Sequence, residues 1–224
     1  MFILRFISYF RKRYIMIQLM RKRLDPDALE VLYDRPFSKE SFEEDFELKG
    51  GKWYVDDEGW LVGENRENCA AMVMSKDEFF GDVLVEFDAA TILPATRDIN
   101  VTWHGSWNEE INKRDIAYVF GIEGWWEGLI GFERSPEYEF KVGTKLFPFE
   151  AGRVYHVAVG NIGNELFIAI DGVLALEVHD PNPIDINKYG RVGFEAYCTK
   201  VKYKNYKVKR ITYTDTAKPY DPEF

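Results

Sequence analysis

The stretch LFIAIDGVLALEV, residues 166–178, decides the fold class of this chain. Two apolar runs, Leu166–Ile170 and Val173–Val178, flank the dipeptide Asp171-Gly172. Asp-Gly between such runs is typical of a type I′ hairpin, because both central residues of that turn need a positive φ. The sequence therefore predicts two antiparallel strands joined by a two-residue turn.

Short runs of the same kind recur along the chain, and turn residues separate them. In one of them Val83, Val85 and Phe87 alternate with Leu84, Glu86 and Asp88, which is the period of a strand. The other runs span residues 29–33, 53–55, 60–63, 70–74, 99–104, 117–121, 129–133, 154–160, 192–197 and 201–214. Many short strands with turns between them are typical of a sandwich or a barrel. We therefore expect an all-β antiparallel domain.

Composition sets the limits on function. The 224 residues suffice for one large domain, and 46% of them are hydrophobic, so a sizeable core is expected. The net charge of −9 argues against sequence-blind binding to nucleic acid, which needs a basic surface. No apolar run is long enough to span a membrane as a helix. The two cysteines, Cys69 and Cys198, exclude a disulfide scaffold.

The N-terminus differs from the rest in charge. Residues 1–24 contain seven bases and no acid, with apolar residues between the charges. This pattern predicts a short basic amphipathic helix that could contact an anionic membrane surface. Translation from Met16 or Met20 is the alternative, which would make the stretch an artefact. The charges interrupt any signal-peptide core, so we expect a cytoplasmic protein.

The domain boundaries follow from this charge asymmetry. We expect residues 1–24 as a separate segment, 25–215 as the sandwich and 216–224 as a tail. Because the predicted strands begin after residue 24, deleting residues 1–24 should leave the sandwich folded.

The C-terminal third resembles a known fold family. Residues 155–159 lead into the hairpin; Gly190-Arg191-Val192-Gly193-Phe194 and a last strand at 206–211 follow. Together they resemble the closing strands of concanavalin A-like lectin/glucanase jelly rolls, over roughly residues 30–213. The chain is also similar to bacterial sugar-processing sandwiches, namely 3-keto-disaccharide hydrolase-like proteins and uncharacterised proteins found with pectin-degradation enzymes. The resemblance implies a two-sheet jelly-roll sandwich that acts on carbohydrates, although this fold hosts many activities.

Residues 98–139 have the composition of a saccharide cleft. Four of the six tryptophans lie there, among glycines and polar residues. Flat aromatic rings can hold the apolar faces of a sugar, while amides and guanidinium groups bind its hydroxyls. The predicted substrate-binding residues are Asn100, Trp103, Trp107, Asn108, Trp125, Trp126 and Arg134. For each tryptophan the alternative is a place in the core.

Strand alternation nominates the catalytic candidates. If Val101 and Trp103 face the core, then Asn100 and His104 face outward, and Glu86, Asp88 and Glu133 join them if their strands are neighbours. Glu133 is the expected acid/base, because a charge in an apolar strand needs a partner. His104 could shuttle protons, with Glu86 or Asp88 as a second carboxylate. The third carboxylate of the sandwich β-glucanase motif is missing after Asp88, so glucanase activity is not expected.

No cofactor motif is present. A structural calcium ion bound by Asp98, Asp180 or Asp185 is an option, since sandwiches of this type often hold one, but no loop has EF-hand-like spacing.

Three functions remain open from the sequence. The first is a bacterial glycoside hydrolase acting on a plant-derived or keto-sugar glycoside. The second is a non-catalytic, lectin-like module that binds a mono- or oligosaccharide. The third is a structural sandwich without a ligand.

Overall fold

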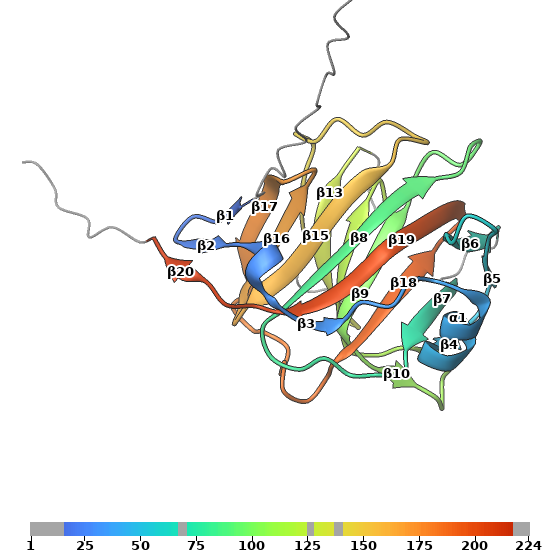
Figure 1. Ribbon diagram of the computed structural model, residues 1–224, viewed down its shortest axis with the longest axis horizontal. Coiled ribbons are helices and arrows are strands. Elements are labelled where there is room, and N and C mark those ends of the chain that lie inside the picture. The colour runs from blue at the N-terminus through green and yellow to red at the C-terminus, as the bar shows by residue number, and fades with distance from the viewer. Residues whose placement is uncertain (1–15, 67–70, 125–127, 137–140, 217–224) are drawn as a thin grey trace, which may run out of the picture.

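The chain folds into two antiparallel β-sheets packed face to face (Figure 1). The computed structural model describes residues 16–66, 71–124, 128–136 and 141–216. Every strand pairing in these residues is antiparallel, and the part described holds a single α-helix, so the expected all-β class is confirmed.

The eight-stranded sheet faces the viewer in Figure 1. Its path runs β17 (Val173–His179), β16 (Glu165–Ile170), β15 (Tyr155–Ile162), β8 (Val83–Thr91), β19 (Thr199–Arg210), β6 (Leu61–Asn65) and β5 (Lys52–Val55). The eighth strand, β3 (Glu30–Tyr33), pairs with the C-terminal end of β19.

The seven-stranded sheet lies behind it. Its order is β14 (Lys141–Thr144), β13 (Ile130–Ser135), β12 (Ala117–Ile122), β9 (Ile99–Gly105), β18 (Arg191–Ala196), β7 (Ala71–Ser75) and β4 (Phe46–Leu48). Because β8 and β9 are consecutive but belong to different sheets, the outward faces of these two strands look in opposite directions.

Alternate side chains of both sheets meet in one apolar core. Phe194 of β18 lies against Tyr203 of β19 and Phe87 of β8, with ring centroids 4.4 and 5.6 Å apart. Trp103 of β9 packs edge-on against Phe132 of β13 at 5.9 Å. All five rings are fully buried, and this alternation leaves the remaining residues of each strand on an outer face.

The hairpin that defines the fold class has the predicted turn. Ile170 and Val173 are paired residues, so Asp171 and Gly172 form the whole loop between β16 and β17. Their φ angles are 51° and 79°, as a type I′ turn requires.

The N-terminal segment forms short strands, although the sequence predicted a helix there. Strands β1 (Ile17–Gln18) and β2 (Lys22–Leu24) form a small sheet with β20 (Thr214–Asp215). The 3₁₀ helix η1 (Pro26–Ala28) follows. Ile17, Leu19 and Leu24 are buried in a second apolar cluster together with Leu84 and Phe167 of the eight-stranded sheet.

The helix prediction is therefore wrong for residues 17–24, because these apolar side chains cover an outer sheet face that is itself apolar. The basic residues before Met16 lie outside the described part. None of the helices described is long and apolar enough to cross a membrane.

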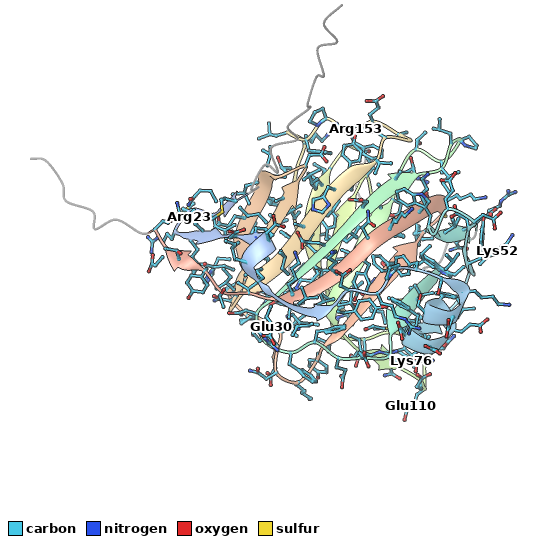
Figure 2. The ribbon with its side chains drawn as sticks, viewed as in Figure 1. Arg23, Glu30, Lys52, Lys76, Glu110 and Arg153 are labelled. Atoms are coloured by element: carbon cyan, nitrogen blue, oxygen red, sulfur yellow. The ribbon has the colours of Figure 1, made fainter. Side chains whose placement is uncertain are left out.

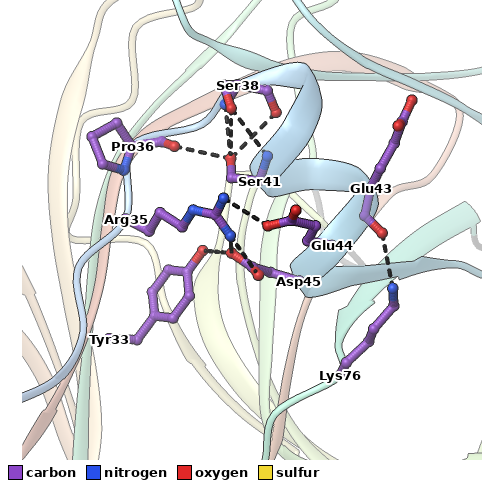
Figure 3. A network of polar contacts seen from close by, with 9 residues as sticks. All are labelled: Tyr33, Arg35, Pro36, Ser38, Ser41, Glu43, Glu44, Asp45 and Lys76. Carbon is purple, nitrogen blue, oxygen red and sulfur yellow. Dashed lines mark hydrogen bonds and ion pairs between the residues drawn. The ribbon is translucent and has the colours of Figure 1, made fainter.

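Helix α1 (Lys39–Asp45) connects β3 to β4 and begins at a capping box, in which the Ser41 N–H donates to Ser38 Oγ at 3.0 Å (Figure 3). Arg35 binds Asp45 at its C-terminal end at 3.0 Å, and Lys76 Nζ donates to Glu43 O at 2.8 Å. The labelled charged side chains in Figure 2, such as Lys76 and Arg153, lie around the rim of the sandwich.

Candidate functional site

A guanidinium between two carboxylates marks the outer face of the seven-stranded sheet. Between β9 and β12 the chain forms a short two-stranded antiparallel sheet, made of β10 (Trp107–Asn108) and β11 (Lys113–Arg114). From β11, Arg114 Nη2 lies 3.0 Å from Glu133 Oε1, and its Nη1 binds Glu195 Oε1. The two carboxylate side chains are 0% and 5% exposed, so three charges are paired almost out of contact with water.

Strand alternation explains why these carboxylates share a face. Phe132 and Phe194 point into the core, so their neighbours Glu133 on β13 and Glu195 on β18 point outward. Asn100 of β9 is the Cα partner of Glu195 and therefore lies beside it on this face. Of the five side chains that the sequence analysis placed on one surface, the structure brings Asn100 and Glu133 to this face.

Three glycines continue the row from Asn100 toward the edge of the sheet. Asn100 pairs with Gly121, Gly121 with Gly131, and Gly131 with Gly143. A Cβ on Gly131 would lie 2.2 Å from Val142 O, so glycine allows the close approach of β14 there. No side chain of this row covers the sheet next to Asn100.

Asp98 lies immediately before β9 and binds the side chain of Asn100. Asn100 Nδ2 donates to Asp98 Oδ1 at 2.9 Å, and the Tyr197 N–H donates to Asp98 Oδ2 at 2.7 Å. Burial raises the pKa of Asp98 to about 7; the Tyr197 N–H opposes this rise, and the negative charge of Glu195 adds to it. A carboxyl group that titrates near neutral pH thus lies at the margin of the Arg114 cluster.

Two buried polar atoms near this cluster have no hydrogen-bond partner among the residues that the structure describes: Asn100 Oδ1 and Trp107 Nε1. Trp107 is the Cα partner of Arg114, and cross-strand partners project to the same side, so its indole also faces the sheet. Lys49 Nζ lies 5.4 Å from the centre of the Trp107 ring. An acceptor and a donor without hydrogen-bond partners suit a hydroxylated ligand, because burying such groups without a partner costs free energy.

Three other predicted binding residues have structural contacts. Trp103 is fully buried and donates from Nε1 to Asn161 Oδ1 at 3.2 Å, so it belongs to the core. Asn108 Oδ1 accepts from the Glu110 N–H at 3.0 Å and helps close the β10–β11 turn. Arg134 forms an ion pair with the buried Asp180. Trp125 and Trp126 lie outside the described residues.

His104 does not share a surface with Glu133. Its backbone has a φ of 48°, which breaks the strand alternation, and the ring is fully buried. Nε2 lies 2.8 Å from Asn161 Oδ1 and Nδ1 lies 3.0 Å from Tyr189 O. Burial lowers the pKa of His104, so the ring is kept neutral between the sheets. The expected common cavity of His104 and Glu133 is therefore wrong, and a proton-shuttle role for His104 stays an untested prediction.

Glu86 and Asp88 lie on the outer face of the other sheet, so the expectation that they join Glu133 is also wrong. The reason is that β8 pairs with β15 and β19, and not with β9. His156 bridges the pair, with Nδ1 2.8 Å from Asp88 Oδ1 and Nε2 3.7 Å from Glu86 Oε1. The carboxylates of Asp88 and Glu86, which favour the charged imidazolium, raise the pKa of His156 to about 9. Burial opposes the ionisation of both carboxyl groups, but His156, together with Lys209 at Glu86 and Asn205 at Asp88, outweighs it and lowers their pKa values.

The three aspartates considered for calcium do not form one site. Asp98 binds Asn100, Asp180 binds Arg134, and Asp185 Oδ1 accepts from the Asn187 N–H in a turn. Across the described ranges, no group of three or more His, Cys, Asp or Glu side chains could hold a metal ion.

Sequence reasoning missed Arg114 and Glu195. Glu195 follows Phe194 in a strand of the recognised C-terminal pattern, and its position opposite the core-facing phenylalanine could have revealed it. Arg114 lies in a polar connection, and nothing in the sequence around it predicts a fold back over the sheet.

Solved structures share this architecture. A protein of unknown function with a galectin-like fold from Bacillus subtilis is 16% identical, with a TM-score of 0.65 over 80% of this chain and 96% of that chain. A carbohydrate-binding module from Bacillus subtilis is 15% identical, with a TM-score of 0.57 over 74% of this chain and 95% of that chain. A β-glucanase from Bacillus licheniformis is 11% identical, with a TM-score of 0.55 over 80% of this chain and 98% of that chain.

No family model and no curated protein matches the sequence. The likeness to the solved structures shows the fold alone, a two-sheet jelly-roll β-sandwich, as the resemblance implied. At such low identity it shows nothing of the activity.

Proposed function

We propose that this protein binds a saccharide on the outer face of the seven-stranded sheet, above Asn100, Arg114 and Trp107. The observation that carries the proposal is the buried, unmet Asn100 Oδ1, together with the unmet Trp107 Nε1, among the residues described there. A sugar hydroxyl can donate to the amide oxygen, and a sugar oxygen can accept from the indole N–H. The carbohydrate-binding module and the glucanase among the similar folds agree with this proposal.

Arg114 gives the site its fixed geometry. Its two terminal nitrogens are held by Glu133 and Glu195, so the guanidinium plane cannot reorient freely. A ligand that meets groups already held in place loses less free energy to ordering them. The half-buried Trp107 adds an aromatic surface next to Arg114 on the same sheet face.

Hydrolysis of a plant-derived or keto-sugar glycoside is the second candidate. Asp98 favours it, because a carboxyl group with a pKa of about 7 can act as a general acid near neutral pH. Glu133, which Arg114 holds in place, would then be the second carboxylate of the site. Binding without turnover remains our first proposal, because both carboxylates of the cluster are engaged by Arg114.

The test measures binding and product in the same samples. We expect wild type to bind one or more neutral oligosaccharides from a panel of gluco-, galacto- and manno-oligosaccharides, measured by titration calorimetry. Trp107→Phe removes the indole N–H donor and part of the ring surface but keeps an aromatic ring, and it should weaken binding about tenfold, which corresponds to about 1.4 kcal/mol. Trp60→Phe is the matched control, because Trp60 is a half-buried tryptophan in the connection between β5 and β6 of the other sheet.

Product release decides between the two candidates. For a hydrolase, reducing ends should appear with wild type, and Glu133→Gln should slow their release by about 10²–10⁴-fold with binding largely kept. For a binding module, neither protein releases product. Equal affinity of wild type and Trp107→Phe for every sugar bound would contradict the proposed site.

A further inference from the structure

A concave site lies at the end of β13, next to the strand position of Glu133 in the Arg114 cluster. It is a pocket of about 300 Å³. Arg134, Ser135 and Pro136 line one side of it, and the loop between β17 and β18 lines the other side with Asn182, Pro183 and Tyr189. None of these residues except Arg134 belongs to the saccharide site predicted from sequence, and Arg134 does not reach the Arg114 cluster.

A buried network fixes the walls of this pocket. Arg134 Nη1 lies 2.5 Å from Asp180 Oδ1, and the Tyr118 hydroxyl lies 3.1 Å from Asp180 Oδ2. The loop is attached to the same network, because the Ile184 N–H donates to the Tyr118 hydroxyl at 3.0 Å and the Asn182 N–H donates to Asp180 Oδ1 at 2.9 Å. Asp180 is 0% exposed. A cavity with such walls is preformed, so a ligand has little chain to order on entry.

The chemistry of the walls suits an uncharged, hydroxylated ring. Pro136, Pro183 and Tyr189 supply apolar surface, and Ser135 and Asn182 supply hydrogen-bonding groups. The pocket is no anion site, although it contains an arginine. The charge of Arg134 is compensated by Asp180, and the exposed Asp185 adds a negative charge at the wall. A volume at the lower end of the range for ligand sites fits a single ring.

The pocket is close enough to the Arg114 cluster for one oligosaccharide molecule to occupy both. Ser135 is two residues after Glu133 on β13 and projects to the same face, so the two Cα atoms are about 6.5–7 Å apart. This separation is comparable to one residue of a saccharide chain.

We infer that the pocket is a second subsite, which binds the neighbouring residue of a neutral oligosaccharide whose first residue lies above Asn100 and Arg114. This inference rests on the proposed function and narrows its ligand to oligosaccharides of two or more neutral residues. It also assigns a binding role to the loop between β17 and β18.

The experiment compares affinity against chain length. Methyl glycosides and neutral gluco-, galacto- and manno-oligosaccharides of two to four residues are titrated into wild type by calorimetry. For a sugar that binds, we expect the affinity to rise at least tenfold from the single residue to the disaccharide or trisaccharide. Asn182→Trp fills the pocket but keeps the loop attached, because Asn182 binds Asp180 and Arg134 through its backbone N–H and C=O. It should abolish this gain and leave single-residue binding unchanged.

Asn187→Trp is the control, since Asn187 is an exposed residue of the same loop that does not line the pocket. Asn182→Arg serves as a second filling variant if the tryptophan disturbs folding, as judged by thermal melting. A gain in affinity with length that survives both filling variants overturns the second subsite and keeps the first. The absence of a gain with length in wild type does the same. If wild type binds no sugar of any length, the proposed function itself fails.

Discussion

Arg114 shows how a single side chain can hold an outer sheet face together. Its side chain is 11% exposed, and its guanidinium contacts two carboxylates that are buried almost completely. Taking three charges out of water carries a desolvation cost, which their mutual hydrogen bonds offset. Removing one member of this cluster therefore lowers the stability of the fold much more than breaking an exposed ion pair does.

We expect Arg114→Met to lower the free energy of unfolding by about 3–5 kcal/mol, because two buried carboxyl groups, Glu133 and Glu195, would lose the cation that they share. Urea unfolding followed by tryptophan fluorescence measures the change. The control is the same substitution in a Glu133→Gln, Glu195→Gln background, where the loss should be much smaller. An equally large loss in both backgrounds would mean that Arg114 contributes through packing alone.

His156 gives the molecule a pH dependence on its other face. Because Asp88 and Glu86 raise its pKa from the ordinary 6.5 to about 9, the folded chain binds this proton more tightly than the unfolded chain does. The stabilisation is therefore complete below about pH 6.5 and is lost as the pH rises through 9.

The urea midpoint of wild type should exceed that of His156→Gln at pH 6, and the difference should shrink by pH 10. His179→Gln is the control, because the described contact of its ring is with the Asn164 amide and not with a carboxylate. A difference that is the same at both pH values would show that the His156 charge contributes nothing.

Single residues were only partly predictable from the sequence. Glu133 could be identified because a charge in an apolar strand needs a partner. His104 could not be placed, because its positive φ turns the side chain away from the face that alternation assigns. Arg114 belongs to a connection, and only the folded chain shows that the connection returns over the sheet.

At the scale of elements, the hairpin of β16 and β17 depends on two residues with positive φ. Gly172 adopts a φ of 79°, a backbone conformation in which a Cβ is strained, so Gly172→Ala should cost about 1–2 kcal/mol of stability. Gly172→Asn should cost less, since asparagine tolerates this conformation better than alanine does. Urea unfolding of both variants tests the ranking, and equal stability of Gly172→Ala and wild type would refute the strained turn.

Strand periodicity identified most of the elements but not their neighbours. The alternation in β8 correctly assigned Phe87 to the core and Asp88 to an outer face. It could not tell which outer face, because the connection from β8 to β9 crosses from one sheet to the other. For this reason the pairing of Glu86 and Asp88 with Glu133 failed, although each strand was identified correctly.

At the scale of the whole molecule, the two ends of the described chain meet on the eight-stranded sheet. Strand β2 pairs with both β1 and β20, and the cluster beneath them contains Leu24, Phe167 and Ile211. Polar contacts add to this packing, because Lys22 forms an ion pair with Glu165 and Lys209 Nζ donates to Pro26 O at 2.9 Å. The N-terminal strands are therefore part of the folded unit, whereas their basic composition had suggested a separate segment.

This packing reverses the sequence-based expectation for deletion of residues 1–24. The deletion removes Ile17, Leu19 and Leu24, each at most 2% exposed, and uncovers Leu84 and Phe167 beneath them. Burial of one such side chain contributes about 1.5–3 kcal/mol, so we expect the melting temperature to fall by about 10 °C or more. A deletion of residues 1–15 is the matched control, since it removes none of these three side chains. A melting temperature for the 1–24 deletion equal to that of the control would show that the sandwich does not need this cover, and would restore the expectation of a separate N-terminal segment.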